Sequence, residues 1–118
     1  GVNEAVDPAN LSDLEKRHIP RIDAPDAVTA GRECEVRVRV GLKLPHGNEP
    51  GHFVQRVDLY ADRTFLARAG LAPHHSYANL VFAVAVPRGV AELVAYAACN
   101  RHGVWAGRKP ITVTEDGQ

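Results

Sequence analysis

Methionine is absent from this chain, and cysteine occurs only twice among its 118 residues. Two cysteines cannot form a four-cysteine metal site, so that class of centre is excluded. An excess of charge is also absent, because fourteen basic residues balance fourteen acidic ones. This balance gives no support for nucleic-acid binding, which usually needs a basic surface. No apolar run approaches the roughly 20 residues that a helix needs to span a bilayer.

The length fits one domain better than two. The first residue is Gly1 rather than methionine, which indicates either a tag remnant or the removal of an N-terminal segment. Residues 1–13 are polar and contain an Asp-Pro pair, so we predict a flexible leader there, followed by a domain over residues 14–118. A removed segment is compatible with an exported, periplasmic protein, which we favour over a cytoplasmic one.

The clearest strand signal lies between Glu33 and Val40. Its even-numbered positions are apolar and its odd-numbered positions are charged. This alternation is typical of an antiparallel sheet with one buried face and one face in water. Cys34 falls on the buried side, so we predict a free core thiol there and no disulfide with Cys99.

Other strands are expected wherever short apolar or alternating runs are bounded by turn residues: 21–23, 53–61, 64–69, 80–86, 92–99 and 111–114. About seven short antiparallel strands predict an all-β fold, an immunoglobulin-like β-sandwich. Helix is expected only over residues 10–17, with Ser12 as the cap and Glu15 three residues later. The segment 41–51 holds three glycines and two prolines and is predicted to be a loop.

The residues that carry chemistry begin with Cys99 and His102, a thiol and an imidazole three residues apart. Gly103 follows them, and we expect it to adopt a positive φ. Three further histidines stand upstream in suggestive settings: His18, His46 and His52. Four imidazoles and one thiolate suit a redox metal and are too many for a four-coordinate structural zinc site.

This arrangement resembles the superoxide reductases of the one-iron type, the neelaredoxins, which share the desulfoferrodoxin iron-binding domain. The family pattern runs Glu-Lys-His-x-Pro, then His-x5-His, then Cys-Asn-x-His-Gly with an apolar residue and tryptophan. This chain carries the three motifs in that order over about residues 14–113: Glu15-Lys16-Arg17-His18-Ile19-Pro20, His46 to His52, and Cys99-Asn100-Arg101-His102-Gly103-Val104-Trp105.

The resemblance implies a mononuclear iron that cycles between Fe²⁺ and Fe³⁺ and reduces superoxide to hydrogen peroxide. It implies Cys99 as the axial ligand and four equatorial ligands: His18, His46, His52 and His102. The residues ahead of this domain in the sequence contain no four-cysteine iron site of the rubredoxin type, so we expect an external electron donor, such as a rubredoxin-like or other small redox protein. Homo-dimers or tetramers are common in the family.

Two departures from the family pattern concern the surroundings of the metal. One extra basic residue precedes His18, so the cation near iron is either Lys16 or Arg17, with Lys16 favoured. If the extra residue bulges out, Glu15 keeps the family role of a sixth ligand to ferric iron. In the second motif, glycines replace the usual proline and glutamate, which is expected to loosen the loop: Gly47 and Gly51.

Three other interpretations remain open at this point. A cupredoxin-like copper protein also combines a β-sandwich with a Cys-x-x-His pair, but it lacks its usual axial methionine here and leaves spare histidines unexplained. A non-catalytic immunoglobulin-like binding module would hold no metal. A family member that binds iron without activity is the third. The His74-His75 pair matches no family ligand and is predicted to be exposed to solvent.

Overall fold

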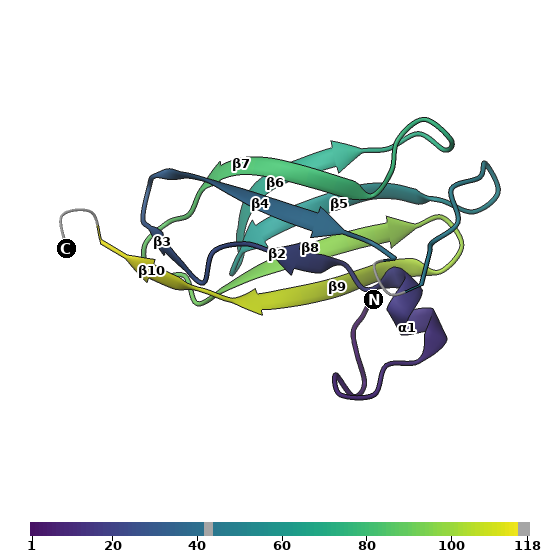
Figure 1. Ribbon diagram of the computed structural model, residues 1–118, viewed down its shortest axis with the longest axis horizontal. Helices are drawn as coiled ribbons and strands as arrows, with labels where there is room; N and C mark the ends of the chain where they lie inside the picture. Colours follow the sequence, from purple (N-terminus) through teal and green to yellow (C-terminus); the bar gives the residue numbers. More distant parts are fainter. Residues whose placement is uncertain (42–43, 116–118) are drawn as a thin grey trace.

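The computed structural model describes residues 1–41 and 44–115, so residues 42–43 of the expected loop and 116–118 of the expected domain lie outside the described residues. The described chain is almost entirely β-structure, and the all-β sandwich prediction is confirmed (Figure 1). Its elements in order are β1 (Val2–Asn3), α1 (Asp13–His18), β2 (Arg21–Asp23), β3 (Ala27–Thr29), β4 (Glu33–Arg39), β5 (Val54–Ala61), β6 (Thr64–Gly70), β7 (Asn79–Ala85), β8 (Glu92–Cys99), β9 (Gly103–Pro110) and β10 (Thr112–Thr114).

Two sheets form the layers of the sandwich. The larger one has the order β1-β9-β8-β5-β6, and the smaller one has the order β2-β4-β7. Neighbouring strands are antiparallel in both, apart from the short parallel pair of β1 with β9. A third, two-stranded sheet joins β10 to β3 in parallel. In the described part of the chain, no helix is long and apolar enough to cross a membrane.

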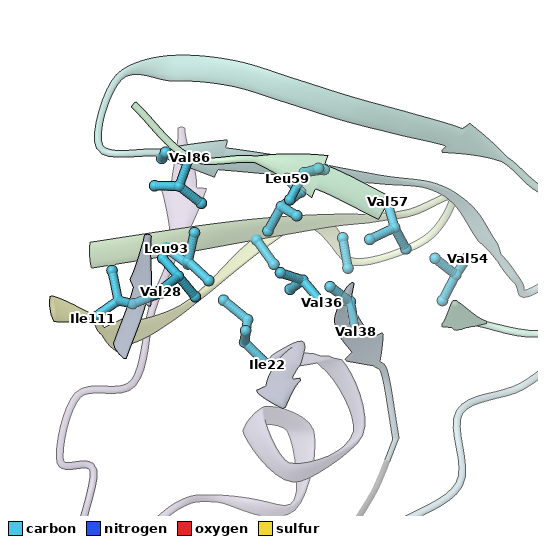
Figure 2. Packing of buried hydrophobic residues seen from close by; sticks show 14 residues of the cluster. Ile22, Val28, Val36, Val38, Val54, Val57, Leu59, Val86, Leu93 and Ile111 are labelled. Atoms are coloured by element: carbon cyan, nitrogen blue, oxygen red, sulfur yellow. The ribbon is translucent and has the colours of Figure 1, made fainter. Parts of the chain in front are cut away.

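The core lies between the two sheets and follows the two-residue period of the strands. Val36 and Val38 of β4 are fully buried, and so are Val57 and Leu59 of β5 (Figure 2). Burying a side chain of this size stabilises the fold by roughly 1.5–3 kcal/mol. Cys34 packs against the same cluster and is a free thiol, as is Cys99, so the prediction of no disulfide is confirmed.

Three strands were not predicted from the sequence: β1, β3 and β9. The omission of β9 matters, since this strand lies beside β8 in the larger sheet. Its residues do not alternate, and Gly107 followed by Arg-Lys-Pro is an unusual strand sequence. A Cβ on Gly107 would overlap the carbonyl oxygen of Pro20. The glycine is therefore required because the chain leaving α1 crosses directly over β9.

The short helix was predicted correctly in place and in its cap. Ser12 accepts a hydrogen bond from the backbone N–H of Glu15, and the Glu15 carboxylate accepts one from the N–H of Ser12. This capping box starts α1, which ends at His18. Residues 1–13, predicted as a leader, contact the domain in the structure: β1 pairs with β9, and the N–H of Val6 donates to Glu15.

Candidate metal centre

All five predicted ligand residues lie at one end of the sandwich, where β8 ends and β9 begins next to α1 (Figure 1). Each stands where an element ends or a loop turns. His18 is the last residue of α1, Cys99 is the last residue of β8, and His102 is in the turn to β9. His46 and His52 lie in the loop before β5. Gly103 has a φ of 81°, which confirms the expected positive φ and lets this turn enter β9.

Four of these residues form a compact set of ligand atoms. One atom from each of His18, His46, His52 and Cys99 lies within 4.8 Å of the other three. Nε2 of His46 is 3.2 Å from Sγ of Cys99, and Nδ1 of His102 is 3.7 Å from the same sulfur. Within residues 1–41 and 44–115, this is the one group of histidine, cysteine and carboxylate side chains placed to hold a metal ion.

The four imidazole rings form a closed quadrilateral. Its sides, measured between ring centroids, are 4.7 Å from His18 to His46, 4.5 Å from His46 to His52, 5.0 Å from His52 to His102 and 4.8 Å from His102 to His18. The diagonal from His18 to His52 is 6.1 Å. Because the diagonal exceeds every side, the rings surround a common centre and do not stack in a row.

Backbone carbonyl groups select which nitrogen of two rings is available to a metal. Nδ1–H of His18 donates to the carbonyl oxygen of Leu14 at 2.7 Å, and Nδ1–H of His46 donates to the carbonyl oxygen of Gly47 at 2.6 Å. A carbonyl can only accept, so the proton lies on Nδ1 and the lone pair lies on Nε2. This is the outer hydrogen-bonding pattern of metal-binding histidines.

Two buried nitrogen atoms show that the cluster fits a metal ion. Nε2 of His18 and Nε2 of His52 are buried and have no hydrogen-bond partner. A buried polar atom without a partner costs roughly 1–3 kcal/mol. Both atoms belong to the group of ligand residues, and a cation bound there would satisfy them.

The charge state of the rings also suits a cation. Burial lowers the pKa of His46 to about 4, and it is the largest cause of the lowered pKa values of His18 and His52. The neighbouring imidazoles lower these pKa values further. These rings are therefore neutral at pH 7, which is the form that binds metals.

Two residues outside the predicted ligand set position the ligands. Trp105 stacks on His18, and its indole N–H donates to the carbonyl oxygen of His102 at 2.9 Å. Asn100 accepts a hydrogen bond from the N–H of Phe53 at 2.7 Å and donates to the carbonyl oxygen of Gly51 at 3.1 Å. Both residues belong to the motif that begins at Cys99, and this motif was the only sign of their role in the sequence.

The loop that holds His46 and His52 is more closely packed than its glycines suggested. Backbone hydrogen bonds join Glu49 and His52 in both directions, at 2.9 and 3.0 Å. A Cβ on Gly47 would lie 2.8 Å from Nδ1 of His52. The glycine at position 47 therefore lets the His52 ring lie against the loop backbone. His74 and His75 are exposed, as predicted.

The three residues proposed to assist at the metal take different positions. Both carboxylate oxygens of Glu15 accept backbone hydrogen bonds, from Ser12 and Val6. Lys16 lines a cavity of about 390 Å³ between α1, β2 and β9, together with apolar side chains. Arg17 is exposed, and its charge adds to the burial that lowers the pKa values of His18 and His52. The charge of Arg17 thus acts on two of the imidazoles, and the choice between the two cations stays a prediction.

The fold and the site define a class: β-sandwich proteins with a cluster of histidines and one cysteine placed to hold a metal ion. The chain belongs to the desulfoferrodoxin family, whose model (Desulfoferrodoxin) matches residues 10–108. A Methanocaldococcus jannaschii protein named "Putative superoxide reductase" is 34% identical over 103 residues, which cover 85% of this chain and 86% of that protein.

Solved structures agree with the family assignment. The superoxide reductase (neelaredoxin) from Ignicoccus hospitalis is 33% identical, with a TM-score of 0.72 over 81% of this chain and 80% of that one. The superoxide reductase from Nanoarchaeum equitans is 25% identical, with a TM-score of 0.68 over 81% of this chain and 94% of that one. The resemblance read from the three sequence motifs is thereby confirmed.

Proposed function

We propose that this protein is a superoxide reductase, which reduces superoxide to hydrogen peroxide at a single non-haem iron. The proposed ligands are the thiolate of Cys99 and the four imidazoles of the closed quadrilateral: His18, His46, His52 and His102. The observation that carries the proposal is this quadrilateral beside a free thiol, with two buried Nε2 atoms that have no other partner.

The relatives support this activity over the alternatives. Those described above are named superoxide reductases. A cupredoxin-like site would leave at least one imidazole of the quadrilateral without a role, and methionine is absent. A binding module without a metal would leave buried imidazole nitrogens unsatisfied.

When bound, iron supplies one electron to superoxide by passing from Fe²⁺ to Fe³⁺. The balanced reaction consumes one superoxide, one electron and two protons, and it yields hydrogen peroxide. The residues of this chain hold and orient the ligands: the carbonyl groups of Leu14 and Gly47 keep Nε2 of His18 and His46 free to bind. Arg17 attracts the anion, but a guanidinium does not give up its proton near neutral pH, so the protons come from water.

The electron comes from outside the domain in this proposal, because the chain has two cysteines and no second metal cluster in its described parts. A rubredoxin-like or other small one-electron donor fits this need. A homo-dimer or tetramer is proposed on the resemblance alone, and sedimentation of the purified protein tests it. Export stays a prediction from the sequence, which fractionation of the host cells tests.

Metal analysis and the oxidised visible spectrum of wild type and Cys99→Ser test the proposal first. We expect about one iron per chain and a thiolate-to-iron absorption band that is lost in Cys99→Ser. The iron-loaded protein should then convert superoxide to hydrogen peroxide without releasing dioxygen. A copper–thiolate spectrum in place of iron would favour the cupredoxin interpretation. If the protein binds neither metal after anaerobic reconstitution, the non-catalytic binding module is the interpretation that remains.

A further inference from the structure

Two arginines each directly precede a histidine of the quadrilateral. Arg17 precedes His18, Arg101 precedes His102, and the centroids of these two rings are 4.8 Å apart. Both arginines are exposed. Backbone connectivity therefore places both arginines next to the same side of the quadrilateral, that between His18 and His102, one at the end of α1 and one in the turn between β8 and β9.

Neither of these arginines forms an ion pair with a carboxylate in the described part of the chain. Most other arginines in the described part of the chain pair with acidic or amide groups; Arg68, for example, donates to both oxygens of Asp58. Arg17 and Arg101 make no ion pair and no side-chain hydrogen bond within residues 1–41 and 44–115. An unpaired guanidinium at the surface keeps its full long-range field.

Arg101 lies close to the metal centre along the chain, two residues after Cys99 and directly before His102. One carboxylate of opposite charge, that of Glu49, lies in the loop between His46 and His52. Two cations against one anion leave this surface positive.

We propose that Arg101 is a second steering residue, which acts with Arg17 to attract the superoxide anion to the histidine quadrilateral. The inference rests on the proposed function. It adds Arg101, which occupies the variable position x of the motif Cys-Asn-x-His-Gly, where the family pattern specifies no residue. Because a guanidinium stays protonated at all physiological pH values, the attraction does not change with pH between neutral and mildly alkaline conditions. Each such charge raises the encounter rate by about two- to fivefold at low ionic strength.

The main test measures the second-order rate of superoxide with the reduced, iron-loaded protein after a pulse of radiation, from about 10 mM to about 0.3 M salt. We expect Arg101→Gln to lower the rate about two- to fivefold at low salt and to weaken its dependence on salt. Arg101→Lys should keep both, and Arg101→Glu should lower the rate further. Arg63→Gln is the matched control, since Arg63 is exposed and unpaired in the described structure but lies at the turn between β5 and β6, away from β8's end.

A second readout does not depend on activity. The metal-free protein is titrated with Co²⁺, whose binding the same positive field opposes. Arg101→Gln should bind Co²⁺ about two- to fivefold more tightly than wild type at low salt, and Arg63→Gln should not. An identical far-UV circular dichroism spectrum excludes a folding defect in each variant.

The outcomes separate this inference from the proposed function. If the wild-type protein does not react with superoxide, the proposed function fails. If it reacts, but Arg101→Gln keeps the wild-type rate, salt dependence and Co²⁺ affinity, then Arg101 is not a steering residue and the function stands. A loss that Arg101→Lys does not rescue would also overturn the inference, because a structural role would explain it better than charge.

Discussion

Trp105 lies against the imidazole of His18: their ring centroids are 5.1 Å apart and their planes meet at 30°. The same indole donates its N–H to the carbonyl oxygen of His102 at 2.9 Å. One buried side chain of β9 thus contacts a proposed ligand on α1 and the backbone of a second one. Parts of the site that are far apart in sequence are held together by this strand.

We expect Trp105→Phe to keep an aromatic ring beside His18 and to lose the hydrogen bond to His102. The free energy of unfolding should fall by about 1–3 kcal/mol, since the partly buried carbonyl of His102 loses its donor. Iron affinity should fall as well, because groups that orient ligands typically change affinity 10- to 100-fold. Urea unfolding of the metal-free protein and metal titration measure the two effects. Tyr77→Phe, at an exposed site, is the control; equal behaviour of both variants would contradict the prediction.

Asn100 ties the turn that carries Cys99 and His102 to the loop that carries His52. Its side chain bonds to Gly51 and Phe53, the two neighbours of His52 in sequence. Asn100→Ala should therefore lower the iron affinity by about 10- to 100-fold. The free energy of unfolding should change less. Asn100→Asp should retain part of the affinity, because it keeps the acceptor for the N–H of Phe53. Asn79→Ala removes an exposed hydrogen bond with Arg37 and is the matched control.

Gly107 provides a test of how β9 positions α1. Gly107→Ala places a methyl group against the carbonyl of Pro20, two residues after His18. We expect the free energy of unfolding to fall by about 1–3 kcal/mol or more, since backbone must move to relieve the overlap. Metal affinity should fall together with stability. Gly70→Ala adds the same methyl group where no atom lies within 4 Å, so a comparable loss there would argue against this explanation.

The sequence predicted the fold where periodicity carries the information. Strands such as β4 and β8 were found with bounds correct to one residue, because their buried and exposed positions alternate or their apolar runs are continuous. β9 was missed because its residues do not alternate between apolar and polar. Its glycine is required by the segment that crosses over the strand, and this requirement does not produce a two-residue period. Such a contact between Gly107 and Pro20 is tertiary and leaves no local pattern.

The candidate site divides in the same way. The family resemblance carried by the three motifs implied five ligand residues, from His18 to His102, and the structure places these five residues next to one another. The supporting residues were harder to predict, because a hydrogen bond such as that from Trp105 depends on where a turn folds back. Which of Lys16 and Arg17 lies near the metal depends on which face of the short helix α1 each residue occupies, and the sequence does not determine this. Lys16, the residue favoured from the sequence, lines the cavity between α1, β2 and β9.

Lys16 and Arg17 can be separated by experiment. Arg17→Gln should lower the rate with superoxide about two- to fivefold at low ionic strength, because its charge acts on the imidazoles. Lys16→Gln should have the smaller effect, because Lys16 lines the cavity between α1, β2 and β9 and its charge is not among the causes of the lowered pKa values of His18 and His52. Stopped-flow or pulsed generation of superoxide gives both rates. A larger loss in Lys16→Gln would show that the chain moves in solution to bring the lysine to the metal.

The carboxylate of Glu15 predicts a pH dependence of stability. Backbone hydrogen bonds from Ser12 and Val6 hold the pKa of Glu15 below its ordinary value of 4.5, and only partial desolvation opposes them. A carboxylate whose folded pKa is lowered stabilises the fold above its unfolded pKa and loses that contribution as pH falls through the folded pKa. Glu15→Gln should therefore be less stable than wild type at pH 7, and this difference should shrink steadily as the pH falls below 4.5.

Chemical denaturation of the two metal-free proteins across this range measures the difference directly, because the titration of the histidines is common to both and cancels. Glu35→Gln removes an exposed carboxylate of β4 and should show little difference at any pH. If Glu15→Gln instead matched wild type at pH 7, the capping box would not stabilise α1. In that case Glu15 would be free to leave Ser12 and Val6 and approach the metal, as the family resemblance implies for this glutamate.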